Sequence, residues 1–243
     1  MNTGNKKLNL SNVTLYSLCW GEDYVKNTLR SMCICNDACT FNDITLLCPM
    51  SDIGASSYII ESLGVNIVNI SPMKNFEYSD FFVTQIGKYI KGDFCLNVQP
   101  DSTIIDISKW DNEFYNYDYI GSPWHSANGF VNNVGNGGFS FRSRKLLEES
   151  SKLVYNKHHP NPLYGCAPED WFICIKNYYN MINKGVKFAP TSVACKFSVE
   201  HSDPYVKIYN PELLSSYQSL GFHGEFNKAG MEYINSYEKK NEQ

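Results

Sequence analysis

The feature that most constrains the fold is a regular alternation of short apolar runs and amphipathic segments along the N-terminal part of the chain. Four runs have the composition of core strands: 13–21, 43–49, 66–70 and 93–101. Three segments between them have helical spacing of apolar residues: about 22–35, 55–64 and 76–91. Strands that alternate with helices in this way form a mostly parallel sheet with helices on its faces. The sequence therefore predicts an α/β fold.

Beyond residue 101 the pattern changes to short strands separated by loops rich in Gly and Asn. Three short strands are predicted there: 102–107, 117–121 and 137–142. Two helices and a strand-like stretch follow: helices at about 143–155 and 170–183, and the stretch at 186–200. A polar tail ends the chain, and its one tight element is the Gly-bracketed segment 221–225. This half is expected to be smaller, antiparallel and rich in loops.

The chain shows no internal repeat, linker or low-complexity segment that would divide it. Its 243 residues suit one domain with a sizeable core. We therefore expect a single domain over 1–243, with its core at about 11–235 and frayed ends at 1–9 and 236–243.

The charge pattern excludes one class of partner. The formal net charge is −4, and the chain has no dense cluster of Lys and Arg. Nucleic-acid binding draws its affinity from many cationic contacts to phosphate. We therefore expect no nucleic-acid partner.

The nine cysteines are expected to be reduced thiols. The segment 1–13 has no apolar signal core, and no apolar run approaches the roughly 20 residues of a membrane span. These features predict a cytoplasmic protein without a transmembrane segment. The cysteines at 33–39 lack a second Cys/His pair at finger spacing, which argues against structural zinc. The neighbouring His158 and His159 would point in opposite directions on an extended chain, which disfavours a metal pair.

Asp101 is the first candidate for a functional residue, because it follows the buried run 93–101 directly. In open α/β sheets, ligands bind beyond the carboxyl ends of the strands. A carboxylate there can bind Mg²⁺ or Mn²⁺, which prefer oxygen ligands. The alternative is a turn residue after Pro100, because Pro-Asp-Ser is good turn chemistry.

His223 is the second candidate. It lies in the sequence GFHG, where the flanking glycines allow close approach of the backbone. Histidine is the commonest metal ligand, although a lone histidine is more often structural. Both interpretations stay open from the residues alone.

The glycine-rich segment 134–144 is the third candidate. Its glycines allow a substrate to approach the backbone, and Asn136 can hydrogen-bond to hydroxyl groups. A hairpin turn explains Asn-Gly-Gly equally well. The segment is not a phosphate loop, because the glycine and lysine spacing of that motif is absent. Ser143 is positioned to cap the helix that follows.

The segment 167–172 opens another predicted helix with Pro168, Glu169 and Asp170. Acidic residues are common in a first turn, because they complement the helix dipole. The same dipole would hold a carboxylate ionised, so that a base of ordinary pKa could take a proton from a hydroxyl group. Four residues share the predicted buried face of this helix: Trp171, Ile175, Tyr178 and Ile182.

Five short motifs occur in an order that resembles a known family. They are QPD, YDYIGSPW, VGNGGFSFR, PED and GFHG, and they span about residues 13–225 with the first strand included. The chain resembles a family of uncharacterised glycosyltransferase-like proteins with the nucleotide-sugar GT-A fold. The resemblance implies a GT-A-like domain with a mostly parallel sheet flanked by helices.

The resemblance also implies roles for particular residues. Asp101 and His223 would bind a divalent cation, Mn²⁺ or Mg²⁺, together with the donor diphosphate. Asp170, with Glu169 as the second candidate, would be the catalytic base. The remaining implied contacts are with the donor nucleotide (Tyr16, Ser17, Gln99, Asp101) and with the acceptor and donor sugar (Asn136, Gly137, Gly138, Trp124).

Position 99 departs from the wider superfamily, which usually has Asp where this chain has Gln99. An amide can bind a ribose hydroxyl, but it adds no negative charge, so metal affinity would depend on Asp101, His223 and the diphosphate.

The resemblance implies an inverting, metal-assisted transfer from a nucleotide-diphosphate sugar to a hydroxyl acceptor, such as a growing glycan. One alternative is a catalytically silent GT-A-like module that binds carbohydrate. A second alternative is a nucleotidyltransferase, but that class has a glycine- and basic-rich loop after its first strand. The segment 19–27 instead has one glycine and an acidic pair.

Overall fold

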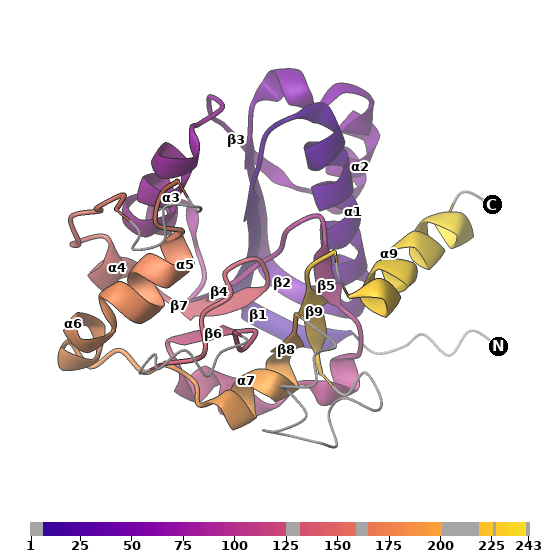
Figure 1. Ribbon diagram of the computed structural model, residues 1–243. Coiled ribbons are helices and arrows are strands. Elements are labelled where there is room, and N and C mark those ends of the chain that lie inside the picture. Colours follow the sequence, from indigo (N-terminus) through magenta and orange to yellow (C-terminus); the bar gives the residue numbers. More distant parts are fainter. Residues whose placement is uncertain (1–6, 125–131, 159–164, 201–218, 226, 242–243) are drawn as a thin grey trace.

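A six-stranded sheet forms the centre of the protein in the computed structural model, which describes residues 7–124, 132–158, 165–200, 219–225 and 227–241 (Figure 1). The strand order is β3-β2-β1-β4-β7-β6. The strands are β1 (Leu8–Leu18), β2 (Cys39–Cys48), β3 (Asn66–Asn69), β4 (Phe94–Asn97), β6 (Tyr119–Gly121) and β7 (Ser140–Ser143). Strands β1 to β4 are parallel to one another, and β7 runs antiparallel to both β4 and β6. The expected mostly parallel sheet is confirmed.

Helices cover both faces of this sheet, as Figure 1 shows. One face, here called the α1 face, packs against α1 (Glu22–Ala38), α2 (Ser57–Leu63) and α7 (Thr191–Phe197). The opposite α3 face packs against α3 (Asn75–Thr84), α4 (Arg144–Ser150), α5 (Glu169–Trp171) and a π-helix (Phe172–Lys176), which α6 (Tyr178–Asn183) follows. No helix within the described ranges is long and apolar enough to cross a membrane.

Strand alternation sends neighbouring residues to opposite faces. Leu15, Leu96 and Phe141 belong to the apolar core of the α1 face. The residues beside them in the sequence, such as Tyr16 and Arg142, are fully buried on the α3 face. The α3 face therefore carries buried polar groups that the α1 face lacks at these positions.

A second sheet of three short strands brings distant parts of the chain together. Its order is β5-β9-β8, made of β5 (Ser102–Ile104), β9 (Gly221–His223) and β8 (Ser198–Val199). Ser102 lies opposite His223 in the antiparallel β5–β9 pair. The final helix, α9 (Lys228–Asn241), packs Ile234 against Ile34 and Phe222.

Several local predictions are confirmed. The buried side chains of α1 include Val25, Leu29 and Met32, as the helical spacing indicated. Ser143 caps α4, because its Oγ accepts a hydrogen bond from the Leu146 N–H at 3.1 Å.

The prediction for the stretch 186–200 was wrong. Within it, Thr191–Phe197 forms the helix α7, and only Ser198–Val199 is a strand. Val193, Ala194 and Phe197 reach the core with helical spacing, so tertiary packing overrides the strand-like composition. Residues up to 241 of the expected frayed end 236–243 belong to the helix α9, which packs against α1 through Ile234.

The N-terminal end and the helix after Pro168 also differ from the predictions. Leu8 already pairs with Cys39 in the sheet, although fraying was expected up to residue 9. The predicted helix 170–183 contains the π-helix, whose wider turn rotates the buried face. Its buried residues are Phe172, Ile173, Cys174 and, in α6, Met181, whereas Ile182 is 37% exposed. His158 is exposed, and His159 lies outside the described residues.

Candidate active site

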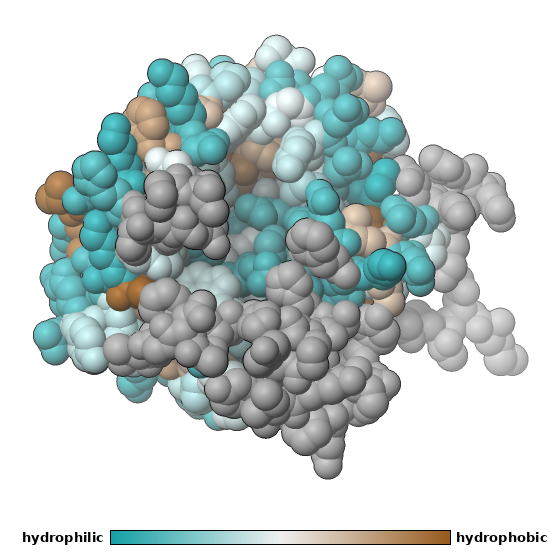
Figure 2. Space-filling view, in the orientation of Figure 1, coloured by the Kyte–Doolittle hydropathy of each residue, from teal (hydrophilic) through white to brown (hydrophobic). Residues whose placement is uncertain are grey.

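A cavity of about 430 Å³ opens at the carboxyl ends of β1 and β4. Its lining residues come from these strand ends, α1 and α3: Ser17, Leu18, Cys19, Trp20, Tyr24, Tyr78, Gln99, Pro100 and Asp101. Figure 2 shows a hollow near the centre of this side of the molecule, bordered largely by hydrophilic side chains. The cavity therefore lies where open α/β sheets bind their ligands.

Three aromatic side chains form part of the cavity wall. The rings of Trp20 and Tyr78 meet edge to face with centroids 5.7 Å apart, and Tyr24 is 58% exposed. Exposed aromatic faces are suited to stacking against a flat heterocycle. None of the three was identified from the sequence, although Trp20 follows β1 just as Asp101 follows β4.

The two residues of β1 expected at the nucleotide differ in position. Ser17 lines the cavity, and its hydroxyl donates to the Val98 carbonyl at 2.6 Å. Tyr16 is fully buried, packs against Phe82 with ring centroids 5.9 Å apart, and is absent from the cavity wall. Ser17 alone of this pair is placed for contact with a ligand.

Gln99, Asp101 and His223 converge at one end of the cavity. His223 Nε2 lies 3.1 Å from Gln99 Oε1 and 3.6 Å from Asp101 Oδ1. The β5–β9 pairing brings them together, and the Gly224 N–H donates to the Asp101 carbonyl at 2.9 Å. Gly138 permits this cluster, because a Cβ there would overlap the imidazole.

The donor set of this cluster fits a divalent cation. Asp101 supplies a carboxylate oxygen, His223 an imidazole nitrogen, and Gln99 turns its amide oxygen toward His223 while its Nε2 donates to Tyr78 Oη at 3.4 Å. Within the described ranges, no group of three or more His, Cys, Asp and Glu side chains could hold a metal ion. A bound cation would therefore need ligand oxygens from a diphosphate and water as well.

His223 has a second acidic neighbour, Glu200, whose Oε1 lies 3.7 Å from Nδ1. Burial lowers the pKa of His223, but the interaction with Glu200 and the charge of Asp101 outweigh burial, so the pKa is raised overall. Because a metal competes with a proton for Nε2, cation binding at this cluster should strengthen as pH rises.

Asp170 lies on the other side of the glycine pair. Its Oδ2 accepts the Gly137 N–H at 2.9 Å, and its Oδ1 accepts the Trp171 N–H at 2.6 Å. Burial, and then the charge of Glu169, raise the pKa of Asp170 to about 7, although the two N–H groups oppose this shift. An ordinary carboxylate pKa was expected at a helix N-terminus, and burial overrides that expectation.

The charge of Asp170 acts on two titratable side chains near the cavity, His223 and Tyr78. It contributes to raising the pKa of both side chains. Gly137 contacts Asp170 through its N–H, and the next residue, Gly138, lies against the imidazole of His223. The structure thus gathers a candidate base and a candidate cation site around one glycine pair.

The other residues expected at the acceptor side have internal contacts. Asn136 is buried, and its Oδ1 accepts the Gly138 N–H at 3.0 Å. Trp124 is partly buried, and its ring packs directly on Gly135, where a Cβ would overlap it. Both side chains therefore support the glycine-rich loop.

Glu169 is paired with Arg142, a residue to which the sequence analysis gave no role. Glu169 Oε1 accepts a hydrogen bond from Arg142 Nη2 at 2.9 Å. The guanidinium of Arg142 is fully buried and lies 4.8 Å from the ring centroid of Phe82 and 5.1 Å from that of Tyr119. The sequence did contain a signal that Arg142 is buried, because alternation along the predicted strand 137–142 places Arg142 on the face opposite Phe141, which the helices of the α3 face cover.

Known proteins resemble this chain in sequence or in structure. A family model described as "Protein of unknown function (DUF5672)" matches residues 65–223. The galactosyltransferase LgtC, in complex with donor and acceptor sugar analogs, is 12% identical with a TM-score of 0.51, over 92% of this chain and 95% of that chain. An active-site mutant of LgtC is 12% identical with a TM-score of 0.54, and the match covers 93% of this chain and 95% of the mutant's chain. No curated protein sequence matches.

At 12% identity, the structural likeness concerns the fold. The α/β architecture with a mainly parallel sheet is that of the GT-A fold, as the motifs implied.

Proposed function

We propose that this chain, which belongs to the DUF5672 family, is a glycosyltransferase that moves a sugar from a nucleotide-diphosphate sugar to a hydroxyl acceptor. One observation carries the proposal: the glycine pair at 137–138 has Asp170 on one side and the Gln99, Asp101 and His223 cluster on the other. This arrangement suits a reaction in which a base and a diphosphate leaving group flank one reacting carbon.

The cavity supports binding of the donor. Trp20, Tyr24 and Tyr78 offer aromatic surface to a nucleobase, and Gln99 can hydrogen-bond to ribose. None of the lining residues carries a positive charge that could neutralise a diphosphate. A divalent cation held by Asp101 and His223 would supply that neutralisation.

Asp170 is proposed as the base of an inverting transfer. Its carboxylate accepts the proton of the acceptor hydroxyl while the oxygen attacks the anomeric carbon. The bond from that carbon to the phosphate oxygen breaks, and its electron pair leaves with the nucleotide diphosphate. A pKa of about 7 keeps much of Asp170 ionised near neutral pH and makes it a stronger base than an ordinary carboxylate.

Glu169 is not the proposed base, because its carboxylate already accepts a hydrogen bond from Arg142. The distinction is testable with Asp170→Asn, which should preserve donor binding and lower kcat by about a thousandfold or more. Binding is measured by calorimetry and kcat by product formation. Turnover that is unchanged in Asp170→Asn would contradict the assignment.

A thermal-shift panel of nucleotide-sugars with and without Mn²⁺ tests the donor and cation sites together. Saturating donor should stabilise the protein by a few kcal/mol only when Mn²⁺ is present. Asp101→Asn and His223→Ala should each remove this metal-linked stabilisation. A full metal response in Asp101→Asn would contradict the cation site. If nucleotide-sugar with Mn²⁺ neither raised the melting temperature nor was hydrolysed, the silent carbohydrate-binding module would be favoured.

A further inference from the structure

A closed chain of hydrogen bonds on the α3 face connects Glu169 to its neighbour Asp170 through the glycine-rich loop. Arg142 donates from Nη2 to Glu169 and from Nε to Ser140 Oγ, both at 2.9 Å. Ser140 Oγ donates to the Gly137 carbonyl at 2.9 Å, and the Gly137 N–H donates to Asp170. Gly137, whose N–H contacts Asp170, is thus held at its carbonyl by Ser140, which in turn accepts from Arg142.

A second buried side chain reinforces this anchor. Asn97 Nδ2 donates to the same Gly137 carbonyl at 2.7 Å, and Asn97 is almost fully buried. Gly137 has no room for a side chain, because a Cβ would overlap Glu169 Oε1. The loop therefore lies directly on the Arg142–Glu169 pair.

Burial of the Arg142–Glu169 ion pair costs free energy that burial of two apolar side chains would not cost. Burying two charges is expensive, and replacing such a pair by apolar residues is often neutral or stabilising. Arginine offers its N–H groups in a rigid planar fork, which lets Arg142 hold Glu169 and Ser140 at once. A function beyond stability would explain why both charges are present.

We propose that Arg142 and Glu169 are positioning residues that hold Gly137 against Asp170 and thereby fix the orientation of the Asp170 carboxylate beside the glycine pair. Neither residue lines the cavity. This inference rests on the proposed glycosyl transfer for its catalytic consequence, but the geometry of the hydrogen-bond chain stands without it.

The electrostatics of Asp170 agree with this role. Burial makes the largest contribution to the raised pKa of Asp170; beyond burial, the charge of Glu169 raises this pKa and the charge of Arg142 lowers it. The other titratable groups around Asp170 come from several elements: Tyr78 of α3, Tyr119 of β6, Cys174 of the π-helix and His223 of β9.

Glu169→Gln tests the pair, because the amide oxygen can still accept from Arg142 while the negative charge is removed. The variant should be less stable than wild type, because the buried Arg142 charge loses its counter-charge. In protein labelled with ¹³C at the Asp carboxyl carbons, the NMR titration midpoint of Asp170 should fall by about one pH unit. The acid limb of kcat/KM should shift by the same amount. An unchanged Asp170 titration in Glu169→Gln would overturn the proposal.

Arg142→Lys tests the geometry, since lysine keeps the charge but loses the fork. We expect kcat to fall by about a hundredfold with KM for the donor unchanged, because the base is displaced rather than the donor site. The Gly137 amide should exchange with solvent about tenfold faster. Wild-type kcat, or wild-type exchange at Gly137, would overturn the role of Arg142.

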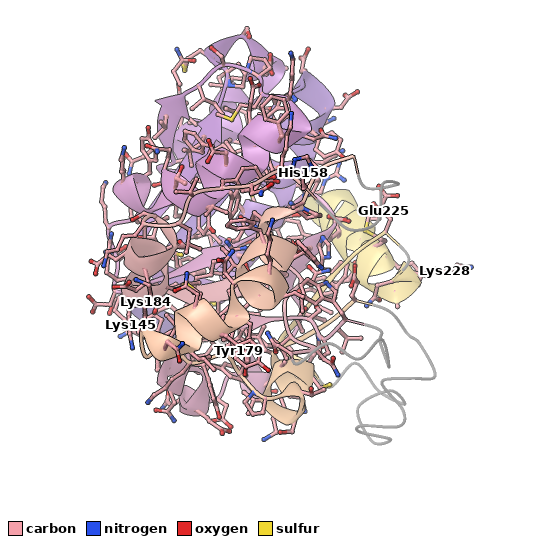
Figure 3. All side chains as sticks on the ribbon, turned by 60° about the vertical axis from the view of Figure 1, so that its left-hand side comes forward. Lys145, His158, Tyr179, Lys184, Glu225 and Lys228 are labelled. Atoms are coloured by element: carbon pink, nitrogen blue, oxygen red, sulfur yellow. The ribbon has the colours of Figure 1, made fainter. Side chains whose placement is uncertain are left out.

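Glu149→Gln is the matched control. Glu149 pairs with Lys152 at 2.6 Å and Lys184 at 3.2 Å at the surface. Figure 3 shows Lys184 beside Lys145 on the outside of the molecule, apart from Glu225, which lies just beyond His223. This variant should leave the Asp170 titration and the pH profile unchanged.

The readouts separate two kinds of failure. If wild-type protein transfers no sugar while the Asp170 midpoint still shifts in Glu169→Gln, the proposed function fails and the positioning pair stands. If transfer occurs and the midpoint does not shift, the positioning pair fails and the proposed function stands.

Discussion

Phe141 and Arg142 are neighbours in β7, yet they enter opposite sides of the sheet. Phe141 stacks on Phe94 with ring centroids 5.0 Å apart, within the apolar core of the α1 face. Arg142 makes an ion pair and a hydrogen bond on the α3 face. Both side chains are fully buried. Burial alone therefore does not distinguish a residue that stabilises the fold from one that holds the site.

The contrast extends to the two faces as a whole. The α1 face is filled by close-packed apolar side chains, whose contribution to stability does not depend on pH. The α3 face beneath the site instead holds the buried Arg142–Glu169 ion pair and the polar side chains of Asn97 and Ser140. Burying two charges costs free energy that apolar packing does not cost. The α3 face thus carries a buried charged pair beside the candidate base.

The largest expected effect is on the α1 face. Phe141→Ala removes a fully buried ring and should lower the free energy of unfolding by about 3–5 kcal/mol. Urea denaturation measures this loss. Donor binding per folded molecule should be unchanged, because Phe141 does not reach the cavity. Loss of donor binding in a folded variant would contradict the assignment of the α1 face to stability alone.

A pH-dependent effect is expected on the α3 face. Since the pKa of Asp170 is raised, the folded protein retains a proton that the unfolded chain releases between about pH 4 and 7. Wild-type stability should therefore fall relative to Asp170→Asn as pH rises, by on the order of 1 kcal/mol per pH unit, and level off above about pH 7. Urea midpoints at several pH values measure the difference. A parallel pH dependence in the two proteins would contradict it.

The smallest effect is expected from Ser140→Ala. The change leaves the buried Arg142 Nε–H without its partner, which costs about 1–3 kcal/mol of stability. It also releases one of the two side-chain donors to the Gly137 carbonyl, so kcat should fall while the donor Kd is preserved. Denaturation and steady-state kinetics together check this. A loss of stability at full kcat would separate the Arg142 anchor from catalysis.

The parallel half of the fold was predictable because its signals are local. Each strand is a short apolar run bounded by a glycine, a proline or a polar residue, and each helix shows apolar residues at helical spacing. The placement of Asp101 beyond β4 followed from the same pattern. That Asp101 and His223 lie together was expected only from the motif order, since no local pattern reveals the β5–β9 pairing.

The missed features depend on tertiary contacts. Arg142 looks like a surface charge until the helices of the α3 face cover it. The π-helix after Trp171 rotated a buried face that a regular helical spacing had placed elsewhere. The helix α9 was not predicted and its sequence was taken for a polar tail, because the residues that stabilise it, Ile34 and Phe222, lie far away in the sequence.

The three-residue strand β9 has a consequence for how the molecule assembles. His223 faces Asp101, while the adjacent Phe222 packs under α9, against Ile234 and the backbone of Gly230. Because side chains alternate along a strand, a slip of one residue would exchange these two rings. The misaligned chain would move His223 away from Asp101 and Phe222 out of its apolar contacts in the same step. The alignment of β9 and the packing of α9 on Phe222 therefore depend on each other.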